Sequence, residues 1–274
     1  MPVISTNTAA NTALRYLNNN SAAQSESLAK LSSGSRIVSA KDDASGLAIA
    51  TSMNADITVL NQAATNVTSG TSVLNTADGA LSNIADILQR MNSLTAQAQS
   101  GSSSTDDLSY IDAEYQQLLE EIDDIATTTA FNGVGLLDGT SAYSTGVDFL
   151  VGTASTDTIT VTMGGADTTT LALNGTSITD AASAATNMDL IDTAITTVSA
   201  MRADVGATLS RFEYRGDVIS TSLENLESAA SAITDVDIAA EQTNFTNAQT
   251  LTSAAIAALG QANSMSQSLL KLLQ

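Results

Sequence analysis

A long stretch without proline limits the folds open to this chain of 274 residues. Between Ala44 and Gln99 apolar residues recur at steps of three and four, as on one face of a helix. At 1.5 Å per residue such a helix would be about 80 Å long. This is too long for a compact globule, so we expect an elongated molecule. The apolar stripe consists of Ile57, Leu60, Ala64, Val67, Leu74, Leu81, Ile84, Leu88 and Met91.

Two more long segments have helical periodicity. In the segment that follows Gly101, Ser104 or Thr105 can cap a helix, and Asp106 and Asp107 suit its N-terminal dipole. Residues 188–233 form a third seam, in which twelve of fourteen positions are apolar. Arg202 and Gly216 occupy the other two positions.

Both ends of the chain carry a heptad pattern, which is typical of paired helices. The C-terminal seam is apolar throughout: Ala248, Leu251, Ala255, Ala258, Ala262, Met265, Leu269 and Leu272. The N-terminal seam is polar at its centre: Val3, Asn7, Ala10, Leu14, Leu17, Ser21, Gln24, Leu28 and Leu31. These could be ordinary amphipathic helices of one core, but few charges line their other faces, so each could bury more than one side. The order of elements is nearly palindromic, and we therefore expect the two ends to meet.

The period changes to two between Phe131 and Gly175. The segment DTITVTMGGADTTTLALNG predicts two Thr-rich strands around a Gly164-Gly165 turn, and YSTGVDFLVG predicts another strand. The expected fold is mainly α with a small β part. Its expected divisions are a terminal coiled coil (1–40 with 239–274), a long-helix part (41–140 with 185–238) and a β-rich surface segment (141–184).

Composition excludes most catalytic chemistry. Without His or Cys there is no Ser-His-Asp or Cys-His system and no usual zinc ligand set, so we expect no enzyme, metal or cofactor. Two carboxylates could still hydrolyse a glycoside, and a two-carboxylate hydrolase stays open as an alternative, although only 3% of residues are aromatic. The net charge of −20 argues against nucleic acid and anionic membrane as partners. No apolar run approaches the ~20 residues of a membrane helix, and the first twenty residues do not read as a secretory leader.

The charge is unevenly distributed. Residues 1–40 carry a net charge of +2 and residues 239–274 a net charge of zero, so residues 41–238 carry −22. A solvated middle with ends that bury against something is the simplest interpretation.

A cluster of charges, LSSGSRIVSAKDDASGLAIA (Leu31 to Ala50), follows an almost uncharged start. It lacks the Gly-Lys-Ser/Thr of a phosphate loop, and Asp42-Asp43 suits a helix start better than a cation site. The segment resembles the N-terminal signature of bacterial flagellin. Three more segments resemble that family in the same order: TAFNGVGLLDG, VGATLSRFEYRGDVISTSLENLESAASAITDVDIAAE and ALGQANSMSQSLLKLLQ.

The resemblance implies a structural subunit of the extracellular flagellar filament. Such a subunit is exported unfolded through the flagellar type III channel, and its ends fold as coiled coils that line the tube on assembly. The implied partners are further copies of the chain, hook-associated junction and cap proteins, an export chaperone and an animal innate receptor. A hook–filament junction protein is the alternative within the same machinery. Only about fifty residues separate the matching halves, so the chain resembles a short form without large outer domains.

Candidate functional residues follow from the resemblance together with the patterns above. The self-assembly candidates are Leu14, Leu17, Leu28, Leu31, Leu251, Ala255, Ala262, Met265, Leu269 and Leu272. Ion pairs between domains or subunits are expected at Arg36, Lys41, Asp42, Asp43, Arg202, Arg211 and Arg215. Arg90, Leu94 and Glu114 match the family's receptor-contact pattern, with contact to the next subunit as the alternative. Gly216 is either a point where two packings can interchange or a site of close packing against Ala64 or a similar small residue.

Overall fold

The chain folds into two compact units in the computed structural model, which describes residues 6–100 and 104–271, with side chains to residue 268. Unit 1 consists of the N-terminal part of the chain up to Ile57 and the C-terminal part from Asn225 onward. Unit 2 consists of residues 58–224. The boundary falls within the two longest helices, α2 (Ala44–Gln99) and α5 (Ala181–Thr234). The expected division into three parts stays a prediction.

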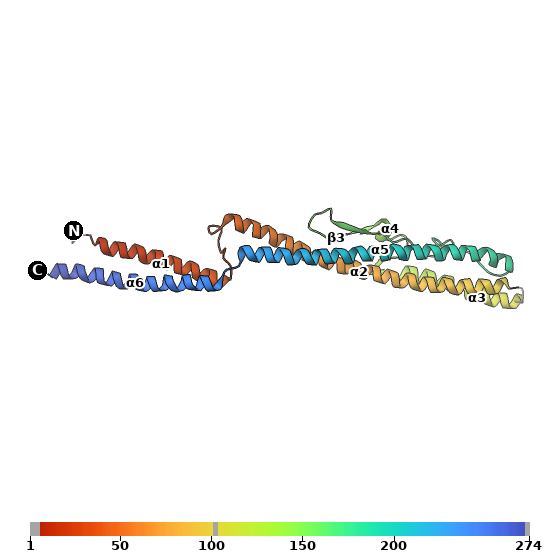
Figure 1. Cartoon of the computed structure of the whole chain (residues 1–274). Coiled ribbons are helices and arrows are strands. Elements are labelled where there is room, and N and C mark those ends of the chain that lie inside the picture. The colour runs from red at the N-terminus through yellow and green to blue at the C-terminus, as the bar shows by residue number, and fades with distance from the viewer. Residues whose placement is uncertain (1–5, 101–103, 272–274) are drawn as a thin grey trace. The chain divides into compact units, whose positions relative to one another are not determined.

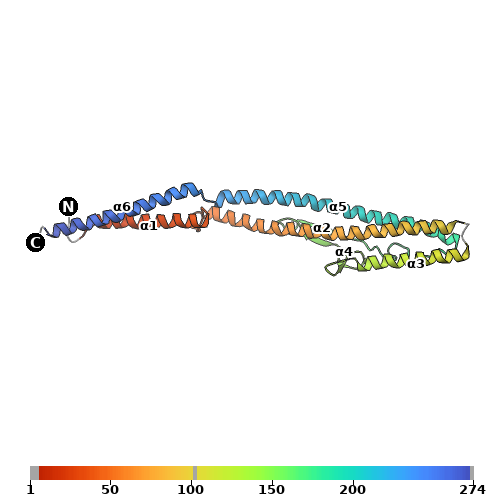
Figure 2. The same ribbon diagram turned by 90° about the horizontal axis from the view of Figure 1, so that it is seen from below.

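Helices α2 and α5 run antiparallel in unit 2, side by side in both views (Figures 1 and 2). Asp78 pairs with Arg202, and further along Asn92 donates to Asp192. The bounds of α2 are those predicted from its period and its lack of proline. Both apolar stripes are confirmed, because their side chains form the core of unit 2: Leu60, Val67, Leu74, Leu81, Ile84, Leu88 and Met91 from α2, with Ile191, Val198, Val205, Phe212 and Ile219 from α5.

Helix α3 (Thr105–Thr128) begins with the predicted cap. The Ser104 hydroxyl accepts from the backbone N–H of Asp107, and the Asp107 carboxylate accepts from the backbone N–H of Ser104. This reciprocal pair satisfies two N–H groups that the helix start would otherwise leave unpaired. Ile111, Tyr115, Leu119, Ile122 and Ala126 form the buried face of α3.

The β part consists of two short antiparallel hairpins. Strands β1 (Ala130–Phe131) and β2 (Val134–Gly135) are joined by Asn132-Gly133, whose positive φ angles of 51° and 79° are those of a type I′ turn. Strands β3 (Val147–Leu150) and β4 (Thr158–Val161) form the second hairpin, after the short helix α4 (Ala142–Thr145).

The predicted hairpin around Gly164-Gly165 is wrong. Strand β4 pairs with β3, so the extra strand predicted in YSTGVDFLVG is its partner. Gly165 instead lets two backbones approach: Ala166 donates to the carbonyl of Leu137, and a Cβ on Gly165 would lie 2.9 Å from the Cα of Gly139.

The segment from β4 to α5 packs into unit 2 rather than lying on its surface. Asp123 of α3 accepts from both the backbone and the hydroxyl of Thr168, and Asp112 accepts from the backbone of Ile178. The apolar side chains of this segment are buried: Met163, Ala166, Leu171, Leu173 and Ile178. The surface position predicted for residues 141–184 stays a prediction. The longest exposed runs in this segment are residues 153–156, in the β3–β4 connection, and residues 179–182, around the start of α5.

Unit 1 is built on α1 (Thr8–Ser33) and α6 (Ile238–Lys271), which lie side by side (Figures 1 and 2). The predicted meeting of the two ends is confirmed, since the Asn7 side-chain amide donates to the carbonyl of Ala262 and to the hydroxyl of Ser266. Across residues 6–100 and 104–271, no helix combines the length and apolar character needed to span a membrane.

Candidate functional site

The most deeply buried side chains in the seam between α1 and α6 are small. Its fully buried positions are Ser27, Ala248, Ala255 and Ala262. Thr252, also on this face, has a buried hydroxyl for which the described residues offer no hydrogen-bond partner. Small and polar side chains remove little apolar area from water, so this seam alone is a weak source of stability.

Several large apolar side chains of the two helices lie outside that seam, whereas Leu17, Leu31, Phe245 and Leu259 are half-buried along it. Leu14, Leu28, Leu251 and Met265 are 45%, 55%, 54% and 56% exposed. Leu251 also lines an apolar groove of about 510 Å³ with Tyr16, Ala13, Asn20, Ala254, Ala255 and Ala258. Unit 1 therefore carries exposed apolar side chains on two sides of the α1–α6 pair, because Leu14 and Leu28 lie about 120–160° around α1 from Tyr16. No part of the described chain covers either side.

The predicted assembly residues divide between the seam and these two exposed sides. Ala255 and Ala262 are buried in the seam, while Leu17 and Leu31 are half-buried. Leu251 and Met265 are exposed on the side of the pair that carries the groove, and Leu14 and Leu28 are exposed on the other side. The side chain of Leu269 and all of Leu272 fall outside the described residues.

The charged stretch that follows α1 joins two chain segments within unit 1. The backbone N–H of Arg36 donates to the carbonyl of Thr234, its guanidinium donates to the carbonyl of Ile233, and Ser35 forms an antiparallel bridge with Asp235. Arg36 thus satisfies carbonyls that the end of α5 would otherwise leave unpaired.

The two aspartates of this stretch accept hydrogen bonds from backbone N–H groups rather than pairing with basic side chains. Asp42 accepts from the N–H groups of Val38 and Ser39, and the hydrogen bond from Ser39 lowers the pKa of Asp42. Asp43 accepts from the N–H of Gly46 and so caps the start of α2, as predicted. The described residues give Lys41 no ion pair, and the one pair on α1 joins Lys30 to Glu26.

The three arginines of α5 differ in their contacts. Arg202 pairs with Asp78 of α2 at 2.9 Å, and this contact raises the pKa of Arg202. Arg211 and Arg215 are exposed, and no described carboxylate forms an ion pair with either. Pairing of these two arginines with another subunit stays a prediction.

The residues that match the receptor pattern are not all at the surface. Arg90 of α2 and Glu114 of α3 are half-exposed and pair at 2.7 Å. Leu94 is 2% exposed and packs in the core. Only the ion pair is accessible to a partner in this conformation.

Close packing between α2 and α5 depends on a glycine that sequence reasoning missed. A Cβ on Gly70 would lie 2.7 Å from the ring of Phe212, whereas a Cβ on Gly216 would lie 3.6 Å from Val67, an ordinary contact. The close-packing explanation therefore fits Gly70 rather than Gly216. The ring of Phe212 also packs edge-on against Phe149 of β3, and Asn66 donates to the carbonyl of Leu150.

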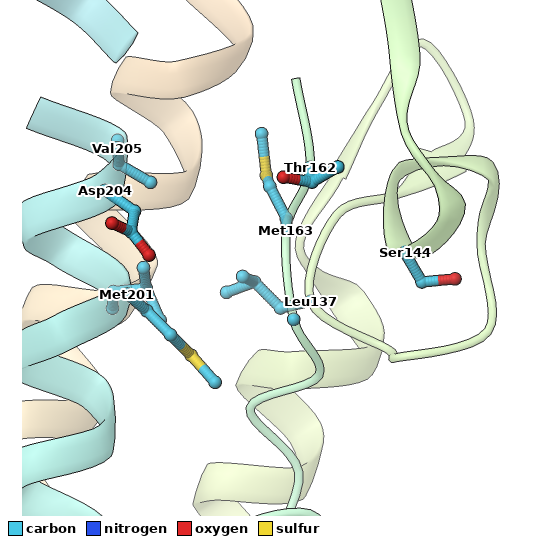
Figure 3. Close-up of a pocket in the computed structure, with 9 residues that line it drawn as sticks. Leu137, Ser144, Thr162, Met163, Met201, Asp204 and Val205 are labelled. Carbon is cyan, nitrogen blue, oxygen red and sulfur yellow. The ribbon is translucent and has the colours of Figure 1, made fainter. Parts of the chain in front are cut away.

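A small pocket of about 150 Å³ separates α5 from the segments that follow β2 and β4 (Figure 3). Met201, Asp204 and Val205 line it from α5, and Leu137, Thr162 and Met163 face them. Its lining combines polar and apolar side chains, with the Asp204 carboxylate as the one charged group among the residues that line it. This arrangement offers no second titratable side chain for acid–base chemistry.

Family models match both halves of the chain. The bacterial flagellin N-terminal helical region matches residues 4–142, and the bacterial flagellin C-terminal helical region matches residues 188–273. Curated relatives align over nearly their whole length. The chain is 37% identical to a flagellar filament 33 kDa core protein of Treponema phagedenis (99% of this chain, 100% of the relative), and 38% identical to flagellin of Bacillus subtilis (99% of each).

Solved structures agree with these matches. Bacillus cereus flagellin has a TM-score of 0.52 at 34% identity, over 61% of this chain and 94% of that one. A flagellar hook-associated protein of Vibrio parahaemolyticus has a TM-score of 0.59 over 71% of this chain and all of that one. At 14% identity the second match shows a shared fold alone.

Proposed function

The chain belongs to the bacterial flagellin family and is a structural subunit of the flagellar filament, and we propose that it polymerises through the exposed apolar side chains of α1 and α6. This proposal rests on the pattern of burial in unit 1, where the most deeply buried side chains are small and several large apolar side chains are exposed. The exposed side chains are those of Leu14, Leu28, Leu251 and Met265. Further copies of the chain are the proposed cover.

Coupling of folding to assembly follows from the energetics of this arrangement. Ordering the backbone costs roughly 1–2 kcal/mol per residue, and burying a Leu or Met side chain returns about 1.5–3 kcal/mol. Within one chain the α1–α6 seam buries none of these large side chains fully. We infer that unit 1 becomes fully stable only when neighbouring copies cover these side chains.

The paired substitution Leu251→Gln with Met265→Gln tests the proposal. Both side chains are more than half exposed, so the helical circular dichroism of the monomer should stay the same. Polymerisation in ammonium sulfate, which strengthens apolar burial, should fall at least about tenfold because each buried Leu or Met contributes more than 1.4 kcal/mol. Electron microscopy and sedimentation measure the yield of filaments.

Ser253→Gln with Ser264→Gln is the matched control, because both serines are exposed on the same helix but point away from Leu251 and Met265 at 100° per residue. The control should form filaments like the unmodified chain. Equal filament yield from both double variants would contradict the side of the α1–α6 pair that carries Leu251 and Met265 as an assembly surface.

The remaining roles expected from the family stay predictions. These are export through the type III channel with a chaperone, contact with junction and cap proteins, and an extracellular location. Recognition by an animal receptor would involve the Arg90–Glu114 pair, and Leu94 would act only by supporting α2 from within the core. Nothing in the comparisons favours a junction protein or a two-carboxylate hydrolase over a filament subunit, and the family supports a structural rather than a catalytic role.

A further inference from the structure

Within unit 2, one side of helix α5 carries two basic side chains. Arg211 and Arg215 are both exposed, and they lie about 40° apart around the helix at 100° per residue. Tyr214 and Val218, which are 74% and 53% exposed, border them. We call this surface, Arg211, Tyr214, Arg215 and Val218, the basic flank.

The opposite flank of the same helix carries acids. Glu213, Asp217 and Glu224 are exposed and lie about 160–240° around the helix from Arg211 and Arg215. Phe212 and Ile219, which pack into the core, lie between the two sets. We call Glu213, Asp217 and Glu224 the acidic flank. Over the eleven residue steps from Glu213 to Glu224 it extends for about 17 Å.

Neither flank is balanced within the chain. Arg211 and Arg215 are like charges four residues apart, and so are Glu213 and Asp217. Such pairs destabilise an isolated helix by about 0.2–0.5 kcal/mol each. The positions three and four residues from each arginine hold no acid, and no described ion pair includes any of these residues. The facing part of α2, from Thr58 to Ala77, is uncharged.

We propose that the basic flank of one copy binds the acidic flank of the next copy. The partner is a second copy of this chain, since each copy carries both halves of a complementary pair of surfaces. The two surfaces differ, so the contact is head-to-tail, and such contacts generate rings or open helical polymers rather than closed pairs. The proposal rests on the proposed filament role and adds a lateral contact in unit 2, separate from the exposed apolar side chains of unit 1.

Because the acidic flank is long, the contact does not require one particular shift of the two copies along the helix axis. Arg211 and Arg215 span about 6 Å along α5, while the three acids span about 17 Å. Copies that are shifted along the axis by up to about two turns of helix therefore still bring a carboxylate to an arginine. Tyr214 beside the arginines supplies a large apolar contact, and aromatic and Arg side chains are enriched at protein interfaces.

Charge reversal of one flank at a time tests this contact. The base-reversed variant carries Arg211→Glu and Arg215→Glu, and the acid-reversed variant carries Glu213→Lys, Asp217→Lys and Glu224→Lys. Either variant alone brings like charges together at every contact, so seeded elongation at low salt should slow by about tenfold or more. An equal mixture should elongate far faster than either variant alone, because alternating copies restore opposite charges at each contact. Light scattering on sheared filament seeds measures the rates.

Two controls separate this effect from altered net charge and altered folding. Arg211→Lys with Arg215→Lys keeps the charge, and Glu120→Lys with Glu121→Lys and Asp124→Lys changes three exposed acids of α3 by the same amount as the acid-reversed variant. Both controls should elongate within about twofold of the unmodified chain. Circular dichroism of each monomer verifies that it is folded.

The outcomes distinguish the lateral contact from the filament role itself. Rescue in the mixture supports the contact, since misfolded variants or altered net charge cannot produce it. Normal elongation of either reversed variant alone, or a mixture no faster than its components, overturns the contact while the filament role stands. An unmodified chain that forms no filaments overturns the filament role.

Discussion

At the scale of single residues, the glycines of the α2–α5 contact show how strongly a position depends on its neighbour. Gly70 faces the ring of Phe212, which itself packs on Phe149, so a methyl group at residue 70 has no room. Gly216 faces Val67 at an ordinary distance. Two glycines in facing helices therefore have different roles, although both break apolar stripes in the sequence.

Substitution of each glycine by alanine should have opposite effects. Gly216→Ala should stabilise unit 2 by about 1 kcal/mol, because glycine in a helix interior costs that much relative to alanine. Gly70→Ala should destabilise it by about 1–3 kcal/mol, the usual cost of overpacking. Thermal unfolding of the two variants measures both, and equal effects would contradict the packing described here. If Gly216 also permits two packings in the filament, Gly216→Ala should still polymerise but change the filament shape seen by microscopy.

The choice between two faces of α1 and α6 shows what residue patterns could not determine. Ala248, Ala255 and Ala262 belong to two adjacent heptad seams, one completed by Leu251 and Met265 and the other by Phe245, Thr252, Leu259 and Ser266. Apolarity favours the first seam, and the chain uses the second for its own pairing. A sequence reveals which positions are apolar, but the partner helix within the chain determines which of them it buries.

At the scale of elements, helix starts are set by carboxylates that bind backbone N–H groups. Asp43, Asp107 and Asp180 occupy such positions at α2, α3 and α5. The hydrogen bond from the Ser104 hydroxyl lowers the pKa of Asp107, and the hydrogen bond from the N–H of Ser183 lowers the pKa of Asp180. A pKa that is lower in the folded state gives stabilisation that is present above the ordinary value and is lost as the pH falls through the folded value.

Ser104→Ala should raise the pKa of Asp107 towards its ordinary value of 3.8, because it removes the largest cause of the lowering. In the unmodified chain the amide signals of Ser104 and Asp107 should titrate with a pKa below 3.8 in nuclear magnetic resonance spectra. The start of α3 should consequently loosen at a higher pH in the variant. A titration that is the same in both proteins would contradict the capping box as the cause.

Elements with local signals could be predicted, and those with distant partners could not. The lack of proline and the regular period of α2 gave both of its ends, and Asn132-Gly133 marks the β1–β2 turn by its own conformational preference. Gly164-Gly165 looks like the same kind of signal. Its role depends on the approach of Gly139 and Leu137, which lie more than twenty residues earlier and leave no trace in the local pattern.

At the scale of the whole molecule, the division of the chain into two units predicts that they can be separated by deletion. Removal of residues 259–274 deletes Ala262 and Ser266, the partners of Asn7, and leaves residues 58–224 intact. The truncated chain should remain a soluble monomer with the helices of unit 2, and it should not elongate filaments. Circular dichroism and seeded elongation measure the two properties, and normal filaments would contradict the role of unit 1.

The pairing of α1 with α6 also has a consequence for the time at which the chain can fold. Asn7 and Ala262 are hydrogen-bonded although they are 255 residues apart in sequence. During synthesis at about 5–20 residues per second, α1 leaves the ribosome more than ten seconds before its partner exists. Throughout that interval Leu17 and Leu31, which are half-buried in the folded chain, have no partner helix to cover them. A nascent subunit therefore cannot complete unit 1 until translation is almost finished, and any factor that acts on an unpaired α1 has those seconds in which to bind.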